Sequence, residues 1–412
     1  MNKDIKKLLI VLALFSLSGG VFYNFWELWL ADNNMSINTI STILSLCSLI
    51  AVSVIFLSSN LINTKRLKKF LNILMLTKAV ILLSLFLLYK SNLNIIIKFL
   101  IMIDYGIDTE IYACFYPLIA LINKDDKIYA ARGLTYDICY YIGVLIVSLL
   151  LGRVIGNYVI GYNTYVITAS ILMFIGIIIL NTIKMDKYIK KVKEKDNNKI
   201  LLKLLKNIKK DKISMCYLSF TFFVNIAYYV IMGLILTIMV KEFSLEPFWA
   251  SNIKLSIGIG AVLIAALILG KFTFKNNYIN ISIKFLGRAI LYIIVWLFPC
   301  IWTFGIALFY TMILSSSYTH VADAPYINRF DNADQLAFAN LKEMVGYLSR
   351  SIGTFLCGTC LVLGFRYNFI VAAIAEFITV LFAYQALYLY NKEKRGKHGR
   401  KRLGRSIKGS VG

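Results

Sequence analysis

The sequence is poor in charge, proline and histidine, and each shortage narrows what the chain can be. Only 16% of its 412 residues are charged and 59% are hydrophobic, which is far from the composition of a soluble domain. With two histidines a histidine-based metal site is not expected, and no G-x-S-x-G or H-E-x-x-H motif occurs. The seven cysteines fall in or at the ends of apolar runs, so they form no disulfide framework. We therefore expect no catalytic residue, metal or cofactor.

What the sequence has instead is a series of long apolar runs. Each is about twenty residues long, roughly the length of helix that crosses a ~30 Å hydrocarbon layer. Pro299 is read as the turn that separates the ninth run from the tenth. The sequence predicts an all-α polytopic membrane protein with twelve spans, at 8–31, 37–60, 70–89, 94–121, 133–155, 164–183, 214–240, 248–270, 284–299, 302–322, 340–363 and 368–390.

Lysine and arginine are distributed unevenly around these spans. Thirty-seven of the 45 lie in the terminal segments and in the loops on the same side, whereas Lys90, Lys241 and Arg366 lie in the loops opposite. Because cytoplasmic loops carry the excess of positive charge, both termini are predicted to be cytoplasmic. The net charge of +24 is therefore a topology signal, and no nucleic-acid partner is expected. Abundant Lys, Ile and Asn suggest a bacterium, and hence its cytoplasmic (plasma) membrane.

A basic stretch between the sixth and seventh spans divides the chain in two. Its second part carries apolar residues at helical spacing between lysines, which predicts an amphipathic helix over 200–208, either on the inner membrane surface or as a solvated linker. The last segment has nine Lys or Arg against one Glu, so we expect a disordered tail that contacts anionic lipid. The predicted units are a six-helix bundle over 1–183, a linker over 184–213, a second six-helix bundle over 214–390 and the tail over 391–412.

This layout resembles the major facilitator superfamily of secondary transporters over residues 1–390. The family's signature between spans two and three runs Gly-x-x-x-Asp-Arg-x-Gly-Arg-Lys, and the matching stretch here is Ser59-Asn60-Leu61-Ile62-Asn63-Thr64-Lys65-Arg66-Leu67-Lys68-Lys69. The final basic pair is kept, but Asn63 replaces the aspartate, so a gating ion pair built on that carboxylate cannot be carried over. The resemblance implies two pseudo-symmetric bundles, with spans one, four, seven and ten lining a central cavity, and leaves the subfamily open.

Polar side chains form stripes along those same four spans. An ionisable group in hydrocarbon costs roughly 2.5 to 3.5 kcal/mol on insertion scales, so each calls for a role. Residues one helical turn apart share a face, and the stripes were identified by that spacing. The candidate substrate and proton pathway consists of Tyr23, Asn24, Glu27, Asp104, Asp108, Phe115, Asn225, Tyr228, Tyr229, Ser315 and Tyr318.

The carboxylates among these candidates have two interpretations. Asp104 and Asp108 lie one turn apart, so one of them can stay protonated and carry a proton. Lys78 lies at the depth of Asp104 on the neighbouring span, so structural pairing of these two is the alternative. Glu27 lies close to the outer end of its span and is either a substrate or proton residue, a structural salt bridge or a side chain that reaches the interface.

Two further charge pairs are predicted in the second half. Arg350 and Glu376 lie within about 7 Å in depth across a short hairpin, a gap that an arginine side chain can bridge, so we expect a structural pair. His320 with Asp323, nearer the cytoplasm, is read as a capped helix end or a pH-sensitive gate.

Together these features favour a secondary transporter that works by alternating access, with a midplane site between two halves that rock against each other. The expected partners are a small organic solute, a proton and the bilayer, with anionic lipids at the basic loops and tail, and the chain is expected to act as a monomer. Acidic and aromatic residues suit an amphipathic or cationic solute. Export, as in drug or metabolite efflux, is slightly favoured over import by a sugar or metabolite symporter. A non-transporting sensor or immunity protein on a transporter scaffold is the other alternative.

Overall fold

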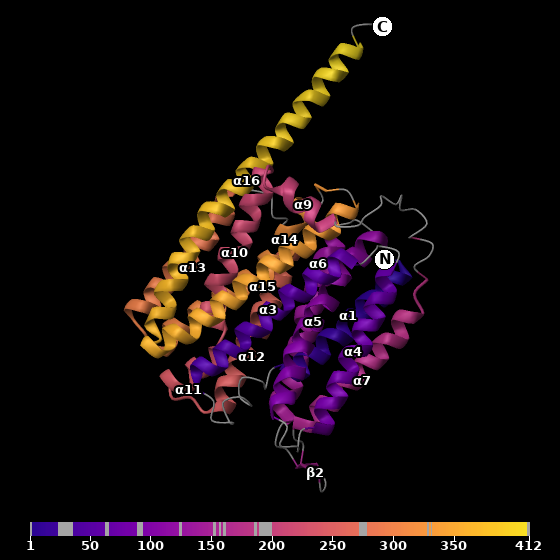
Figure 1. Ribbon diagram of the computed structural model, residues 1–412. Coiled ribbons are helices and arrows are strands. Elements are labelled where there is room, and N and C mark those ends of the chain that lie inside the picture. Colours follow the sequence, from indigo (N-terminus) through magenta and orange to yellow (C-terminus); the bar gives the residue numbers. More distant parts are fainter. Residues whose placement is uncertain are drawn as a thin grey trace.

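Long helices lie side by side in two groups (Figure 1). The computed structural model describes residues 2–23, 36–61, 66–88, 94–122, 126–150, 154–155, 158–159, 162–184, 188, 200–271, 278–327, 329–330 and 332–409. The N-terminal end of α1, the linker helix α9 and the C-terminal end of α16 lie toward one end of the molecule, and the short hairpin β1–β2 lies at the other.

Each of the twelve predicted spans contains a helix, the first being described as far as Tyr23. The end of the fifth, 133–155, is wrong, because its helix ends at Leu150 and Val154–Ile155 form a strand. The first group comprises α1 (Lys3–Tyr23), α3 (Ile37–Leu61), α4 (Leu67–Leu88), α5 (Asn94–Ile122), α6 (Asp126–Leu150) and α7 (Tyr162–Asn181), with β1 (Val154–Ile155) and β2 (Tyr158–Val159) between the last two. The second comprises α10 (Lys212–Met232), α11 (Ile235–Glu242), α12 (Pro247–Lys271), α13 (Tyr278–Leu297), α14 (Ile301–Ile327), α15 (Asn332–Leu363) and α16 (Arg366–Gly409), and α9 (Ile200–Ile208) precedes it.

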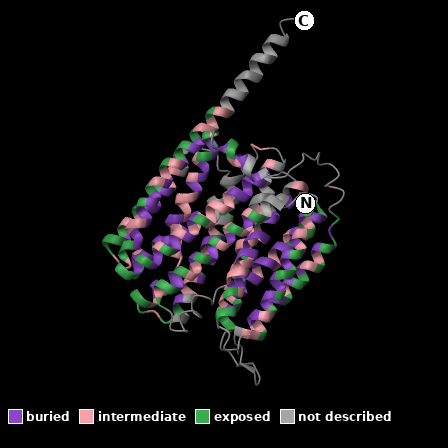
Figure 2. Ribbon diagram, in the orientation of Figure 1, coloured by how far each residue is buried: buried purple, intermediate pink, exposed green. Residues whose placement is uncertain are grey.

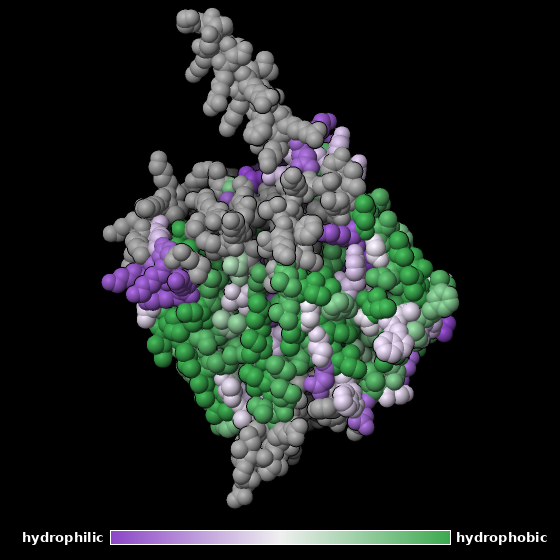
Figure 3. Space-filling model, turned by 180° about the vertical axis from the view of Figure 1, so that it is seen from behind, coloured by the Kyte–Doolittle hydropathy of each residue, from purple (hydrophilic) through white to green (hydrophobic). Residues whose placement is uncertain are grey.

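The outer surface of the bundle is apolar. Large hydrophobic side chains point outward, among them Leu57, Leu87 and Leu381, which are 61%, 71% and 68% exposed. A wide hydrophobic belt covers the face shown in Figure 3, and Figure 2 shows exposed positions along the outward faces of the helices. A soluble protein rarely exposes so large an apolar area. By length and composition, seven stretches of the described chain can cross a membrane unaided.

The two groups meet along a few helices. In the first group α1 packs against α6 and α7, and α4 packs against α5 and α7; in the second α16 packs against α10 and α13. Between the groups α3 packs along α15, and α6 packs against α12 and α14. Ser45 of α3 and Ser351 of α15 share a hydrogen bond of 2.8 Å between their hydroxyls, so this contact is close in the middle of the bundle.

The seventh span is broken, which the hydropathy pattern did not predict. α10 ends at Met232 and α11 begins at Ile235, with Leu234 between them at φ −136° and ψ 43°. α15 approaches closely at this break, since a Cβ on Gly233 would lie 3.2 Å from the Cα of Thr354 and one on Gly353 would lie 2.9 Å from the Cβ of Tyr229. Small residues let α10 and α15 approach at this depth.

Two expectations about the basic segments are wrong. The apolar face of α9, formed by Leu201, Leu204 and Ile208, is buried under protein, since α9 packs on α3, α10 and α15. The predicted helix is therefore present, but protein rather than lipid or solvent covers its apolar face. The tail is also not disordered, because α16 continues as one helix to Gly409 and projects beyond the bundle (Figure 1).

Candidate functional site

One buried ammonium holds two carboxylates inside the first group of helices. Lys78 Nζ of α4 lies 3.1 Å from Asp104 Oδ2 and 2.7 Å from Asp108 Oδ1, both on α5. The Tyr23 hydroxyl of α1 donates to the same Asp104 oxygen at 2.7 Å and accepts from Lys78 at 3.1 Å. The ammonium also lies 4.9 Å from the centroid of the Tyr23 ring. Three helices thus contribute to one polar cluster, which we call the Lys78 cluster (Tyr23, Lys78, Asp104 and Asp108).

The Lys78 cluster contains the pairing that the sequence predicts for Lys78 and Asp104. It also recruits Asp108, because residues i and i+4 of α5 present both carboxylates to the same ammonium. Lys78 and Asp104 are fully buried, whereas the Asp108 side chain keeps 14% of its surface exposed. The cluster holds two carboxylates and one cation, so in its ionised form it carries one negative charge in excess, on the side where Asp108 is accessible.

The predicted pair between Arg350 and Glu376 is wrong. Glu376 of α16 accepts two hydrogen bonds, of 2.9 and 2.8 Å, from Arg288 of α13, and both side chains are fully buried. Arg350 of α15 instead lies between two rings, with its guanidinium carbon 4.9 Å from the centroid of Tyr105 and 4.6 Å from that of Tyr229. Counting residues along neighbouring helices gives the depth of each side chain in the membrane. It does not give the direction in which the side chain points from its helix.

Arg288 is a buried group that sequence reasoning missed. It lies near the start of the predicted span 284–299 without a predicted role, whereas α13 begins at Tyr278 and carries Arg288 into the bundle. Arg132 precedes the predicted span 133–155 but lies inside α6, 7% exposed, with its guanidinium carbon 4.3 Å from the centroid of the Tyr112 ring. The apolar residues on both sides of Arg288 are the sequence signal that could have placed it inside a helix.

Tyrosines join the two groups of helices at the level of these charges. Tyr23 contacts Tyr105 edge to face at 5.8 Å between ring centroids, and Tyr105 contacts Tyr347 of α15 at 6.3 Å. Tyr105 belongs to α5 and Tyr229 to α10, so Arg350 is enclosed by one ring from each group. The Tyr105 hydroxyl is buried and has no hydrogen-bond partner among the described residues.

The other predicted site residues are spread more widely. Asn225 of α10 faces Gly346 of α15 and donates to the Thr221 carbonyl at 2.7 Å. Tyr228 contacts Tyr229 edge to face at 5.0 Å. Phe115 is fully buried against Phe15 within the first group, so it contributes to packing there.

Ser315 lies on α14 and is partly buried, whereas several other predicted residues have no described side chain. Asn24 and Glu27 lie outside the described residues, as does Asn63 of the signature stretch. Tyr318, His320 and Asp323 belong to α14 by backbone, but their side chains are outside the described part of the chain. Across the side chains that the structure does describe, no group of three His, Cys, Asp or Glu could hold a metal ion.

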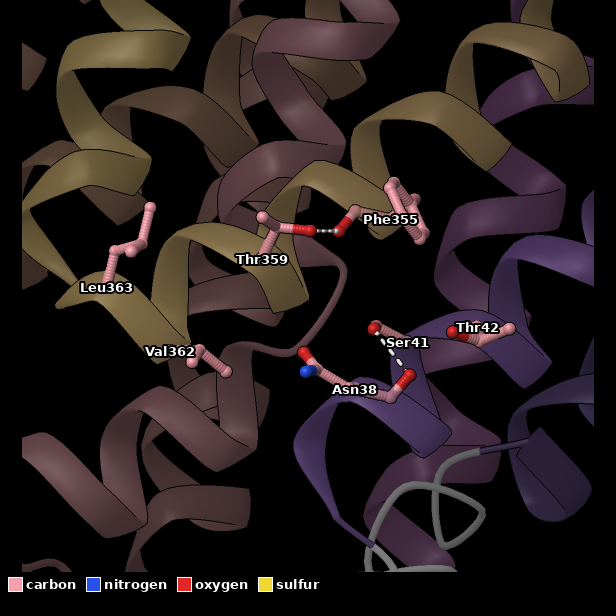
Figure 4. Close-up of a pocket in the computed structure, with 7 residues that line it drawn as sticks. All are labelled: Asn38, Ser41, Thr42, Phe355, Thr359, Val362 and Leu363. Atoms are coloured by element: carbon pink, nitrogen blue, oxygen red, sulfur yellow. Dashed lines mark hydrogen bonds between the residues drawn. The ribbon is translucent and has the colours of Figure 1, made fainter.

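A separate pocket of about 270 Å³ lies between the first turns of α3 and the last turns of α15 (Figure 4). Ser41 and Thr359 within it donate to carbonyls of their own helices, at 3.0 Å to Asn38 and 3.1 Å to Phe355. Its lining has no charged side chain and consists of Asn38, Ser41, Thr42, Phe355, Thr359, Val362 and Leu363. The pocket follows the line where the two groups of helices meet and lies apart from the buried charges.

Comparison with known proteins identifies the fold. By sequence, the chain matches no family model and no curated protein. By structure it is similar to the human organic anion transporter MFSD10 (TM-score 0.65, 8% identity, 93% of this chain and 100% of that one). It is also similar to the xylose transporter XylE from E. coli (0.64, 15%, 92% and 97%) and to the major facilitator superfamily transporter FucP (0.60, 10%, 92% and 98%). The matches span nearly complete chains on both sides.

Proposed function

We propose that this chain, which has the twelve-helix fold of the major facilitator superfamily, is a secondary transporter that carries a small organic solute by alternating access. The observation that carries the proposal is the set of charged and tyrosine side chains buried at mid-depth and supplied by both groups of helices. Such groups are costly in a membrane and are typical of a substrate or ion pathway. The six-helix bundles 1–183 and 214–390 are the two halves that we expect to rock against each other.

The depth of these groups supports a site at the membrane midplane. Asp108 lies fourteen residues from either end of α5, about 21 Å at 1.5 Å per residue. Arg350 lies thirteen residues from either end of the apolar stretch Ala337–Leu363, about 20 Å. A solute held at this level is equally far from both faces of the membrane, which is the geometry that alternating access needs.

The Lys78 cluster supports coupling to protons. With two carboxylates on one ammonium, a proton on Asp108 removes the excess negative charge, and Asp108 is the member of the cluster with exposed surface. The groups that face it are Lys78 from α4, Asp104 from its own helix and, at longer range, Arg350 from α15. We propose that Asp108 takes up and releases the coupling proton while Lys78 holds Asp104.

Transport itself is tested by labelling a cysteine at Asn225, which lies between α10 and α15, in a variant without native cysteines. A membrane-impermeant maleimide is applied to right-side-out and to inside-out vesicles. We expect Asn225→Cys to react from both sides, because the site opens to each in turn, whereas Leu381→Cys on the lipid-facing surface reacts from neither. Reaction of Asn225→Cys from neither side, or from one side under every condition, would contradict alternating access.

Proton coupling is tested in proteoliposomes that contain a pH-sensitive dye, with a panel of organic acids, amines, sugars and nucleosides. For a solute that moves protons with the wild type, we expect Asp108→Asn to carry the solute at a rate that no longer responds to a pH gradient. Glu242→Gln, at an exposed carboxylate at the end of α11, is the control and should couple as the wild type does. If Asp108→Asn shows the same gradient-driven flux as the wild type, Asp108 is not the residue that carries the coupling proton. The same assay in vesicles of opposite orientation gives the direction of transport, and we propose export.

A further inference from the structure

Arg350 differs from the other buried cations in what surrounds it. Lys78 contacts two carboxylates and Arg288 contacts one, in both cases at hydrogen-bond distance. Around Arg350 no carboxylate of the described residues forms an ion pair, and its guanidinium lies over the faces of Tyr105 and Tyr229. Stacking on two rings stabilises a guanidinium by a modest amount but does not use its five N–H donors. A cation in this state, partly removed from water, is complementary to an anion.

Arg350 also lies where a transported solute would bind, rather than where a structural charge would lie. It lies in the middle of α15, and its two rings come from opposite halves, Tyr105 from α5 and Tyr229 from α10. Although it is deep in the bundle, part of its surface is accessible, whereas Arg288 is fully buried. An anion held here would touch both halves at once.

The surrounding groups favour one kind of anion. The Tyr105 hydroxyl is buried without a partner among the described residues and can donate to an oxygen, and Tyr347 lies next to it. A planar guanidinium binds a planar carboxylate through two parallel hydrogen bonds. Ring faces and edges around it suit an apolar or aromatic body. One cation balances one negative charge, and the excess carboxylate of the Lys78 cluster, coupled electrostatically to Arg350 through Asp108, disfavours a dianion.

We propose that the solute is an organic monocarboxylate, with its carboxylate bound by Arg350 and Tyr105 and its body packed beside the rings of Tyr105 and Tyr229. This reverses the sign expected from the sequence, where Asp104 and Asp108 suggested a cationic solute. Both carboxylates contact Lys78, so the buried charge that has no ion-pair partner among the described residues is that of Arg350. The inference rests on the proposed transport function, because it names the solute class of the same site.

The experiment measures binding without transport. The purified full chain in lipid nanodiscs is titrated calorimetrically with benzoate, 4-hydroxyphenylacetate and hexanoate, with the primary amide of each, and with benzylammonium. We expect at least one carboxylate to bind saturably and its amide to bind at least about tenfold more weakly, since hydrogen bonds to charged groups carry that difference. Carboxylate binding should fall by about tenfold or more in Arg350→Gln and by less in Arg350→Lys, which keeps the charge but not the planar fork.

Controls keep the outcome interpretable. Arg366→Gln removes the same charge at an exposed position at the start of α16 and should bind as the wild type does. A gel-filtration profile and an unfolding temperature like those of the wild type show that each variant is folded, and Arg350→Lys provides a second reading if Arg350→Gln fails this check. Binding of no carboxylate in the panel, binding unchanged in Arg350→Gln, or binding of benzylammonium in their place overturns the proposal. The labelling of Asn225→Cys is independent of these titrations, so the solute class can fail while alternating access stands.

Discussion

The ion pair between Arg288 and Glu376 joins α13 to α16 through two hydrogen bonds at a fully buried site. Removing one partner leaves the other charged and buried, which costs about 3 to 5 kcal/mol. We therefore expect Glu376→Gln to lower the unfolding temperature of the purified protein strongly.

The double variant Arg288→Met/Glu376→Leu is the matched control for that prediction, because it removes both charges and keeps the volume. It should recover most of the lost stability in the same thermal unfolding assay. A double variant that is as unstable as Glu376→Gln would show that the pair is needed for more than mutual neutralisation.

At the scale of residues, the contacts that the sequence could predict were those between residues on consecutive helices. Lys78 and Asp104 were placed correctly because they lie on consecutive helices at similar depth, and depth follows from counting residues. The partner of Glu376 was not, because Arg288 lies on α13, which packs against α16 although two helices separate them in sequence. The stacking of Arg350 depends on the rotation of α5, α10 and α15 about their axes, which a single sequence does not fix.

At the scale of elements, glycines set how closely α1 and α6 approach. A Cβ on Gly143 of α6 would lie 2.6 Å from the Leu17 carbonyl oxygen and 2.8 Å from the Val21 nitrogen of α1. Both neighbours are backbone atoms, so the helices must separate. We expect Gly143→Ala to destabilise the protein by about 1 to 3 kcal/mol in thermal unfolding.

Gly305 of α14 provides the comparison, since a Cβ there meets nothing within 4 Å. Gly305→Ala should leave stability unchanged or raise it slightly, by up to about 1 kcal/mol, because alanine favours the helix. Equal effects of the two substitutions would contradict the close α1–α6 contact.

The N-terminus of α10 depends on one carboxylate. Asp211 is its N-cap, accepting from the Ile213 amide at 3.2 Å and the Ser214 hydroxyl at 2.6 Å, and it pairs with Arg329, which also contacts Glu393. Burial of Asp211 opposes its ionisation, but the Ser214 hydrogen bond and Arg329 outweigh burial and lower the pKa of Asp211 below its ordinary value. The ionised group therefore stabilises the fold above the unfolded-state pKa of about 3.9, and this is lost as pH falls through the lower folded-state pKa.

This gives a pH prediction with its own control. Between about pH 5 and 3 the unfolding temperature of the wild type should fall more steeply than that of Asp211→Asn, which keeps a capping side chain but does not ionise. Asp211→Ala, without a cap, should be less stable than Asp211→Asn at neutral pH by about 0.5 to 2 kcal/mol. Parallel pH profiles for the wild type and Asp211→Asn would contradict the role of the charge.

The elements themselves were the most predictable part of the molecule. A run of apolar residues long enough to cross the membrane must form a helix, because backbone groups in hydrocarbon have no other partner. The break after Met232 was not predictable in this way, because the apolar stretch Lys212–Glu242 is continuous through it, and the close contact of Gly233 with Thr354 involves a helix that is distant in sequence. The docking of α9 and the helical continuation of α16 likewise depend on more than hydropathy.

At the scale of the whole molecule, transport requires the contact between α3 and α15 to open. Cysteines in place of Ser45 and Ser351, whose hydroxyls are 2.8 Å apart, can be oxidised to a disulfide that holds the two halves together there. In a background without native cysteines, this pair of substitutions is combined with Asn225→Cys. The reactivity of position 225 with a maleimide is then measured before and after reduction of the disulfide.

The most direct measurement is therefore the reactivity of Asn225→Cys from each side of the membrane in that locked protein. With the disulfide formed, we expect labelling from the side of the β1–β2 hairpin to be lost and labelling from the side of α9 to persist, and reduction to restore both. If position 225 reacts equally from both sides whether the disulfide is present or absent, the two halves do not alternate around the buried charges, and the account is wrong.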